Sequence, residues 1–168
     1  MDNNITIDNL AKIISEKILN YENFIPKEIN FILDKDQKRE LMILDLFNMT
    51  KAVSRSFEDK NELLKKILDK IHSLSYTKYC ENEEDENKFE ELLNERYFVY
   101  YSIFNSKSDS TLLLLSNNTL LTILGEDNAK KNKDMFLFWL TFLKNMFGQT
   151  YLNRCIFLKD MQEKYIIE

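Results

Sequence analysis

The chain has 168 residues with 2 Gly and 1 Pro, and its formal net charge is −5. So few turn-forming residues argue against a sheet-rich fold of this size and favour long helices with short connections. The 23 basic and 28 acidic side chains are spread along the chain without a basic tail or patch. Duplex nucleic acid is therefore not an expected partner, because phosphate contact needs clustered positive charge.

The amino-terminal sequence, MDNNITIDNL, does not have the basic region and apolar core of a secretory signal. The chain also lacks the run of about 20 apolar residues that a membrane span needs. Cys80 and Cys155 show no framework spacing and are typical of a reduced pair. We therefore expect residues 1–168 to form a single cytoplasmic domain without a membrane span.

Apolar residues recur at steps of three and four near the start of the chain and predict a first amphipathic helix. It would begin after an N-cap at Thr6 or Asp8 and run to about Glu22. Pro26 predicts a break there, because the residue before a proline is disfavoured in helical geometry. A short helical turn is expected over residues 28–33.

A second long helix is expected from an N-cap at Asp34 or Asp36 to about Ser56. Within it, residues 41–49 (LMILDLFNM) form an apolar surface wider than one stripe. Asp45 interrupts this surface. Because a buried carboxylate needs a partner or a raised pKa, Asp45 is a candidate functional residue, with a structural ion pair as the alternative.

The next predicted helix has an apolar stripe that runs from Leu63 to Leu74. Ser56 and Asp59 precede it with the S-x-x-D spacing of a capping box. His72, the only histidine of the sequence, falls at the flank of the stripe near the expected helix end. A protonated imidazole at that place would complement the helix macrodipole.

Residues 81–95 contain eight acidic side chains and a single basic one, Lys88. Acids stabilise the first turns of a helix, so a long helix is expected over residues 83–105. Its second half, residues 97–104 (YFVYYSIF), is apolar or aromatic nearly all round and predicts burial in the core. Arg96 beside it must reach water or a carboxylate.

Residues 111–124 (TLLLLSNNTLLTIL) fit two structures. A helix closed by Gly125 suits the leucine content, whereas a hairpin that turns at Asn117-Asn118 suits the pair of turn-forming residues. Strict in–out alternation is missing, and this favours the helix.

In the stretch from Asp134 to Gly148, every residue from Met135 to Leu140 is apolar. Six such residues go right round a helix, which predicts a helix buried on all sides and ending at its glycine. Ala in place of Trp139 or Phe138 would then cost about 3–5 kcal/mol of stability. A last helix would follow over residues 151–167. We therefore expect an all-α, single-domain bundle of six or seven helices around this central apolar helix.

Patterns for catalysis or metal binding are scarce. One histidine is too few for a di-iron bundle, and Glu86 with Glu90 at i,i+4 is more typical of a solvated helix face than of a cation site. An enzyme would have to pair His72 with Cys80, with Cys155 or with a carboxylate. The sequence therefore predicts no catalytic residue, no metal site and no cofactor.

By elimination, the sequence favours a non-catalytic protein-binding module of the inhibitor, immunity or adaptor type, which acts stoichiometrically on a protein partner. A helical pocket for an apolar small molecule and an enzyme that uses His72 are the alternatives. The predicted partner-binding residues lie on the helix over residues 83–105, whose acidic start would steer a basic partner while its aromatic residues hold the complex. They are Glu83, Glu86, Glu90, Tyr97 and Tyr101.

Overall fold

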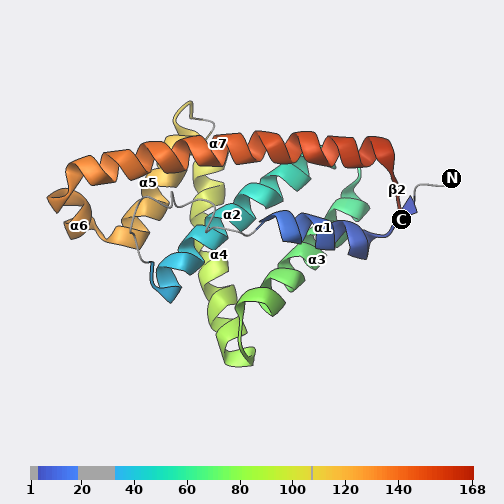
Figure 1. Ribbon diagram of the computed structural model, residues 1–168, viewed down its shortest axis with the longest axis horizontal. Coiled ribbons are helices and arrows are strands. Elements are labelled where there is room, and N and C mark those ends of the chain that lie inside the picture. The colour runs from blue at the N-terminus through green and yellow to red at the C-terminus, as the bar shows by residue number, and fades with distance from the viewer. Residues whose placement is uncertain (1–3, 19–32, 107) are drawn as a thin grey trace.

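The computed structural model describes residues 4–18, 33–106 and 108–168 (Figure 1). These segments contain seven helices and two very short strands. In chain order they are β1 (Asn4–Ile5), α1 (Ile7–Ile18), α2 (Lys35–Ser56), α3 (Asn61–Tyr79), α4 (Glu83–Asn105), α5 (Thr111–Leu124), α6 (Glu126–Lys131), α7 (Lys133–Lys164) and β2 (Ile166–Ile167). The predicted all-α helical bundle is confirmed. Among the described residues, no helix combines the length and the apolar character that crossing a bilayer requires.

Helix α2 is the central helix of the bundle. All nine residues from Met42 to Thr50 are buried, and α2 packs against α1, α3, α4, α5 and α7. A capping box fixes its start. The Asp34 carboxylate accepts a hydrogen bond from the backbone N–H of Gln37 (2.8 Å), and the Gln37 side chain accepts one from the N–H of Asp34 (3.1 Å). Of the two N-caps that the sequence allowed, Asp34 and Asp36, the structure has Asp34.

Helix α7 forms one long edge of the molecule, and the other helices lie mainly on one side of it (Figure 1). Trp139 and Leu143 are buried, but Leu137 is 58% exposed and Phe138 is 51% exposed. The prediction that this stretch is buried on all sides is therefore wrong. An edge helix can bury only the side that faces its neighbours, here mainly α2 and α5.

The sequence predicted that a helix ends at Gly148, and this prediction is wrong. Gly148 lies inside the 32-residue helix α7. A Cβ atom at this position would lie 3.3 Å from Cδ1 of Leu112 on α5. The glycine therefore lets α5 approach α7 closely, and the helix continues because its packing outweighs the low helix propensity of glycine. The expected separate helix over residues 151–167 is the second half of α7 followed by β2.

Helix α4 has the predicted bounds, but it is not a core helix on all sides. Phe89, Leu93 and Tyr100 are buried, whereas Phe98 is 80% exposed. Arg96 reaches a carboxylate, as expected: its Nε and Nη2 donate to Glu40 of α2 at 2.7–3.0 Å. Only one side of α4 is therefore covered by the bundle.

The start of α3 and the ends of α2 and α5 test the local signals that the sequence offered. Lys60 is the N-cap of α3 without a side-chain bond, so the capping box predicted at Ser56 and Asp59 is wrong. Ser56 still belongs to α2, and its carbonyl accepts from Gln162 of α7 (2.8 Å). Residues 111–124 form the helix α5, and Gly125 ends it with a φ of 76°, a left-handed conformation that glycine tolerates best.

The strands β1 and β2 lie side by side at the end of α7 (Figure 1). Thr6 caps α1, since its hydroxyl accepts from the backbone N–H of Asn9 (3.3 Å). β1 pairs in parallel with β2, and the N–H of Ile7 donates to the carbonyl of Glu168 (2.9 Å). The expected end of the first helix near Glu22 and the break at Pro26 lie outside the described residues, as does all but the last residue of the turn expected over 28–33.

Candidate interaction surface

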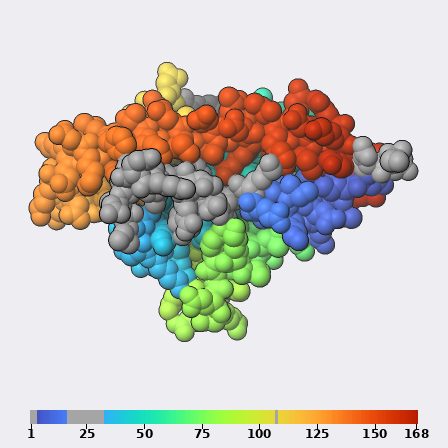
Figure 2. Space-filling view, viewed as in Figure 1, coloured from blue at the N-terminus to red at the C-terminus, as the bar shows by residue number. Residues whose placement is uncertain are grey.

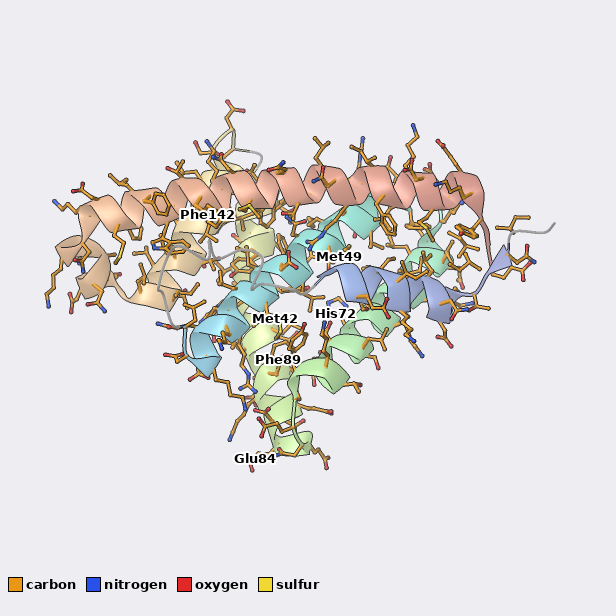
Figure 3. All side chains as sticks on the ribbon, in the orientation of Figure 1. Met42, Met49, His72, Glu84, Phe89 and Phe142 are labelled. Carbon is orange, nitrogen blue, oxygen red and sulfur yellow. The ribbon has the colours of Figure 1, made fainter. Side chains whose placement is uncertain are left out.

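The predicted partner-binding acids lie at the start of α4, where the α3–α4 connection projects from the bundle and Glu84 points away from it (Figure 3). Glu83, Glu86 and Glu90 are exposed. Asp85 instead turns inward and accepts from Arg39 of α2 at 2.5 Å, and this hydrogen bond lowers the pKa of Asp85. One acid of the run therefore anchors α4 to α2, and its neighbours face solvent.

Tyr97 lies between α4, α2 and α3. Its hydroxyl is 3.1 Å from Thr50 Oγ1 and 3.1 Å from His72 Nε2, and its ring packs edge-on against Phe47. Burial raises the pKa of this hydroxyl well above its usual range. Tyr97 thus takes part in the internal packing of the bundle.

Tyr101 is half-buried and packs edge-on against Phe47 at a centroid distance of 5.2 Å. Lys51 covers it, with Nζ 4.5 Å from the Tyr101 ring centre and 4.2 Å from that of Phe104. Burial lowers the pKa of Lys51. The structure therefore groups the three glutamates at the projecting end of α4 and places both tyrosines against α2. Their role in partner binding stays a prediction.

His72 uses both ring nitrogens inside the bundle (Figure 3). Nδ1 lies 2.8 Å from the carbonyl oxygen of Leu68, which can only accept, so Nδ1 carries the proton. Nε2 then accepts from the Tyr97 hydroxyl, and Tyr97 accepts from Thr50. Burial lowers the pKa of His72 and keeps it neutral. An imidazole held in this way is not poised to activate a cysteine.

The two cysteines are half-buried free thiols. Burial is the main cause that raises the pKa of Cys80 and of Cys155 above the ordinary thiol value. The thiolate is the nucleophilic form, so a raised pKa makes a thiol less reactive. The residues of the enzyme alternative are thus built into packing and hydrogen bonds.

Asp45 forms a buried ion pair with Arg154, which joins α2 to α7. Arg154 Nη2 donates to Asp45 Oδ2 (2.8 Å), while Nη1 donates to the Asp45 carbonyl (3.1 Å) and to Asn48 Oδ1 (3.0 Å). Asn48 Nδ2 donates to the carbonyl of Phe147 (2.8 Å). Burial raises the pKa of Asp45, and the guanidinium opposes this rise. The structural alternative considered for Asp45 is the one that the contacts favour.

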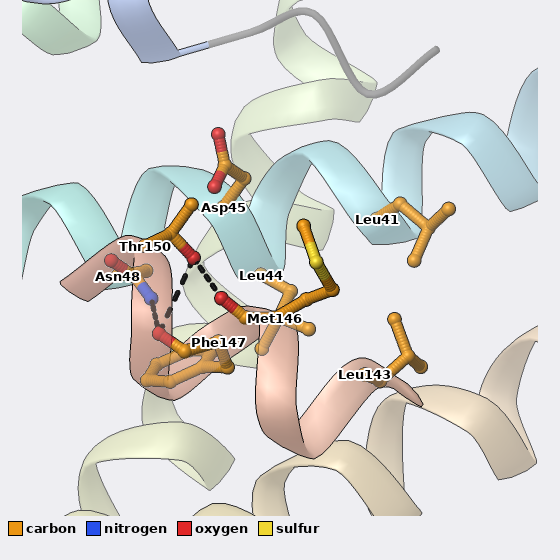
Figure 4. A pocket seen from close by; sticks show the side chains of 8 residues that line it. All are labelled: Leu41, Leu44, Asp45, Asn48, Leu143, Met146, Phe147 and Thr150. Carbon is orange, nitrogen blue, oxygen red and sulfur yellow. Dashed lines mark hydrogen bonds between the residues drawn. The ribbon is translucent and has the colours of Figure 1, made fainter. Parts of the chain in front are cut away.

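A small cavity of about 30 Å³ lies beside this ion pair, between α2 and α7 (Figure 4). Asp45, Asn48 and Thr150 contribute polar atoms to its wall, and the rest is apolar. Such a volume holds a water molecule or two. A pocket for a small organic ligand measures roughly 300–1,000 Å³, so this cavity does not hold one.

The feature that sequence reasoning missed is the exposed apolar side of α7. We call six residues at steps of three and four along its outward side the α7 stripe. They are Phe138, Phe142, Asn145, Gln149, Leu152 and Ile156. Phe138 is 51% exposed, Leu152 59% and Ile156 54%. Figure 2 shows α7 as a continuous ridge at the surface. The signal that could have revealed this side is the length of α7. A long helix at the edge of a bundle cannot bury every side of an apolar run.

Comparisons with known proteins assign the chain to no family. No family model, no curated protein and no solved structure matches it.

Proposed function

We propose that this protein is a non-catalytic protein-binding module that binds its partner through the outward side of α7. The observation that carries the proposal is the exposure of five of the six residues of the α7 stripe, all but the half-buried Phe142, together with that of Leu137 (58%), on a helix whose opposite side is already packed on α2 and α5. Large apolar patches on a folded protein are typical of interaction sites. An aromatic side chain such as Phe138 is also the kind of residue that dominates binding energy.

The aromatic residues at the start of α7 support a preorganised surface. The Phe138 ring stacks on Phe142 at 6.4 Å and meets Trp139 edge-on at 5.7 Å, while Trp139 itself is buried. An exposed ring that rests on one buried ring, Trp139, and one half-buried ring, Phe142, loses little freedom on binding, which lowers the entropic cost of association. This fits a module of the inhibitor, immunity or adaptor type that acts stoichiometrically.

The alternatives have less support. The cavity between α2 and α7 is roughly a tenth of the smallest volume expected for an organic ligand. His72 has both ring nitrogens bonded within the bundle, and the pKa of each thiol is raised. Two larger hollows at the surface, of about 530 and 540 Å³, are lined mostly by charged and polar residues and do not suit an apolar molecule. The pocket and enzyme alternatives therefore gain no specific support, whereas the binding proposal is supported by the α7 stripe.

The test is affinity purification of the tagged protein from its source cell, with quantitative mass spectrometry. The variant Phe138→Ser/Ile156→Ser changes two exposed positions of the stripe, and Phe98→Ser on α4 is the matched control, because Phe98 is 80% exposed. We expect the stripe variant to lose a co-purifying protein at least tenfold and the control to retain it. Equal recovery with both variants and the parent would place the binding surface elsewhere.

A further inference from the structure

The α7 stripe has the spacing of a coiled-coil seam. Successive members are separated by 4, 3, 4, 3 and 4 residues, which is the alternation of a and d positions in a heptad pattern. Such a pattern keeps one side of a helix facing a second helix along its length. Within this chain, the neighbours of α7 lie on its opposite side.

The stripe is also symmetric about residue 147. Within the six positions of the stripe, residues at equal distances before and after it carry matching chemistry, so that an antiparallel copy would pair apolar residues with apolar ones and amides with amides. The pairs are Phe138 with Ile156, Phe142 with Leu152, and Asn145 with Gln149. We propose that a second copy of this chain packs on the α7 stripe in antiparallel orientation, with the two-fold axis near residue 147. This inference rests on the proposed function and names the partner of the same surface.

The amide pair defines the register. Asn145 and Gln149 are both exposed, and each amide can donate and accept a hydrogen bond. In the proposed register each amide faces an amide of the partner helix, and the apolar pairs flank them on both sides. A shift by one heptad would place an amide against an apolar residue and leave it unpaired, which is costly at a buried seam.

The position of Lys159 at the end of the stripe favours antiparallel over parallel packing. Asp134 and Lys159 are exposed and lie on the same flank of α7. In the antiparallel register Asp134, 13 residues before the axis, lies at the level of Asp160 of the second copy, and Lys159 of that copy lies one position away from it on the same flank. A parallel dimer would instead place Lys159 at the level of Lys159 of the second copy, where like charges repel. Among the described residues, Lys159 makes a long pair with Glu163 (3.8 Å).

Five of the six residues of the stripe are exposed in the described part of the chain, and Phe142 is half-buried. The α4–α5 loop rises past the middle of α7 in Figure 1 and leads into α5. The start of α5 contacts α7 at Gly148, which lies about 80° around the helix from the centre of the stripe at 100° per residue. The contact with α5 is therefore beside the stripe and not on it.

Cysteine cross-linking tests both the contact and its direction. The variants Asp134→Cys and Lys159→Cys are made on a Cys80→Ser/Cys155→Ser background. Each variant is oxidised alone, and a mixture of the two is oxidised in parallel. We expect a disulfide-linked dimer in the mixture alone, because each cysteine would be more than about 35 Å from its own copy in the antiparallel register. Cross-linking of each variant with itself but not in the mixture would show a parallel dimer and overturn the proposal.

Sedimentation velocity of the otherwise unchanged chain, from low micromolar to near-millimolar concentration, gives an independent measure. We expect a monomer–dimer equilibrium that Ile156→Lys weakens at least tenfold, since a two-fold interface contains the change twice, and that Phe98→Lys leaves unchanged. A monomer throughout would overturn this inference. Stripe-dependent capture of another protein would still support the proposed function. A chain that stays monomeric and also captures no protein through the stripe would refute both the inference and the proposed function.

Discussion

Replacing Arg154 with methionine tests the buried ion pair that joins α2 to α7. The side chains of Arg154 and Asp45 are only 8% and 6% exposed. Methionine keeps an apolar stem of similar length but donates no hydrogen bond. The variant therefore leaves the Asp45 carboxylate, the Asp45 carbonyl and the Asn48 side-chain oxygen without the donor that each has in the parent.

The expected cost is about 3–5 kcal/mol, because removal of one partner leaves an uncompensated buried charge. A domain is stable by only about 5–15 kcal/mol in total. At this chain length each kcal/mol lowers the melting temperature by about 2–4 °C, so the variant should melt about 6–20 °C below the parent.

The loss should also depend on pH. Burial raises the pKa of Asp45 and Arg154 opposes the rise, so removing Arg154 raises the pKa further above its unfolded value near 3.9. When the folded pKa of an acid is the higher one, the folded state binds the proton more tightly. Stability is then greatest below the unfolded pKa and falls as the pH rises through the folded pKa. The variant should be closest to the parent near pH 4 and furthest from it above pH 7.

Urea unfolding followed by circular dichroism, at several pH values, measures both effects. Arg55→Met is the matched control, because the Arg55–Glu58 pair is 68% and 56% exposed and should change stability by less than about 1 kcal/mol. The double variant Asp45→Leu/Arg154→Met should recover most of the loss, since a well-packed apolar pair replaces a buried ion pair at little cost. A loss below about 1 kcal/mol, or an equal loss at pH 4 and pH 8, would refute the reasoning.

Three further predictions follow from burial and charge. In urea unfolding, Trp139→Ala should cost about 3–5 kcal/mol, because Trp139 is only 7% exposed, whereas Phe138→Ala should cost less than about 1 kcal/mol, because Phe138 is 51% exposed. Equal losses of stability would contradict the position of α7 at the edge of the bundle. His72→Gln should keep the fold at a cost of about 1 kcal/mol near pH 8, through the lost bond to Tyr97. Because burial lowers the pKa of His72, the parent should lose stability as the pH falls below 6.5. The difference in unfolding free energy between the parent and His72→Gln should therefore become smaller there, and a difference that stays constant from pH 8 to pH 5 would contradict this. Reversing Glu83, Glu86 and Glu90 to Lys should slow association with a basic partner at low salt and have less effect at 0.15 M salt, where screening acts over about 8 Å. Stopped-flow rates that are unchanged at both salt concentrations would leave these acids as an ordinary solvated helix face.

The sequence by itself determined which segments are helical and where several of them begin and end. Asp34 caps α2, α4 spans residues 83–105, and Gly125 closes α5, all as predicted. Caps, propensities and apolar periodicity act between residues no more than four apart, so they can be read locally. The capping box at Ser56 and the helix end at Gly148 failed where contacts with other helices prevailed: α2 runs on to Ser56, which Gln162 contacts, and α5 packs against Gly148.

Only the tertiary structure decided which apolar helix is central. Residues 41–49 and 135–140 are both apolar nearly all round, and nothing local separates them. α2 is enclosed because five helices pack around it, while α7 packs mainly on two and keeps one side exposed. The partner of Asp45 is likewise 109 residues away, at Arg154. Burial and long-range pairing depend on how all the helices fill space together, and for this reason the α7 stripe, the candidate binding surface, emerged only in the folded chain.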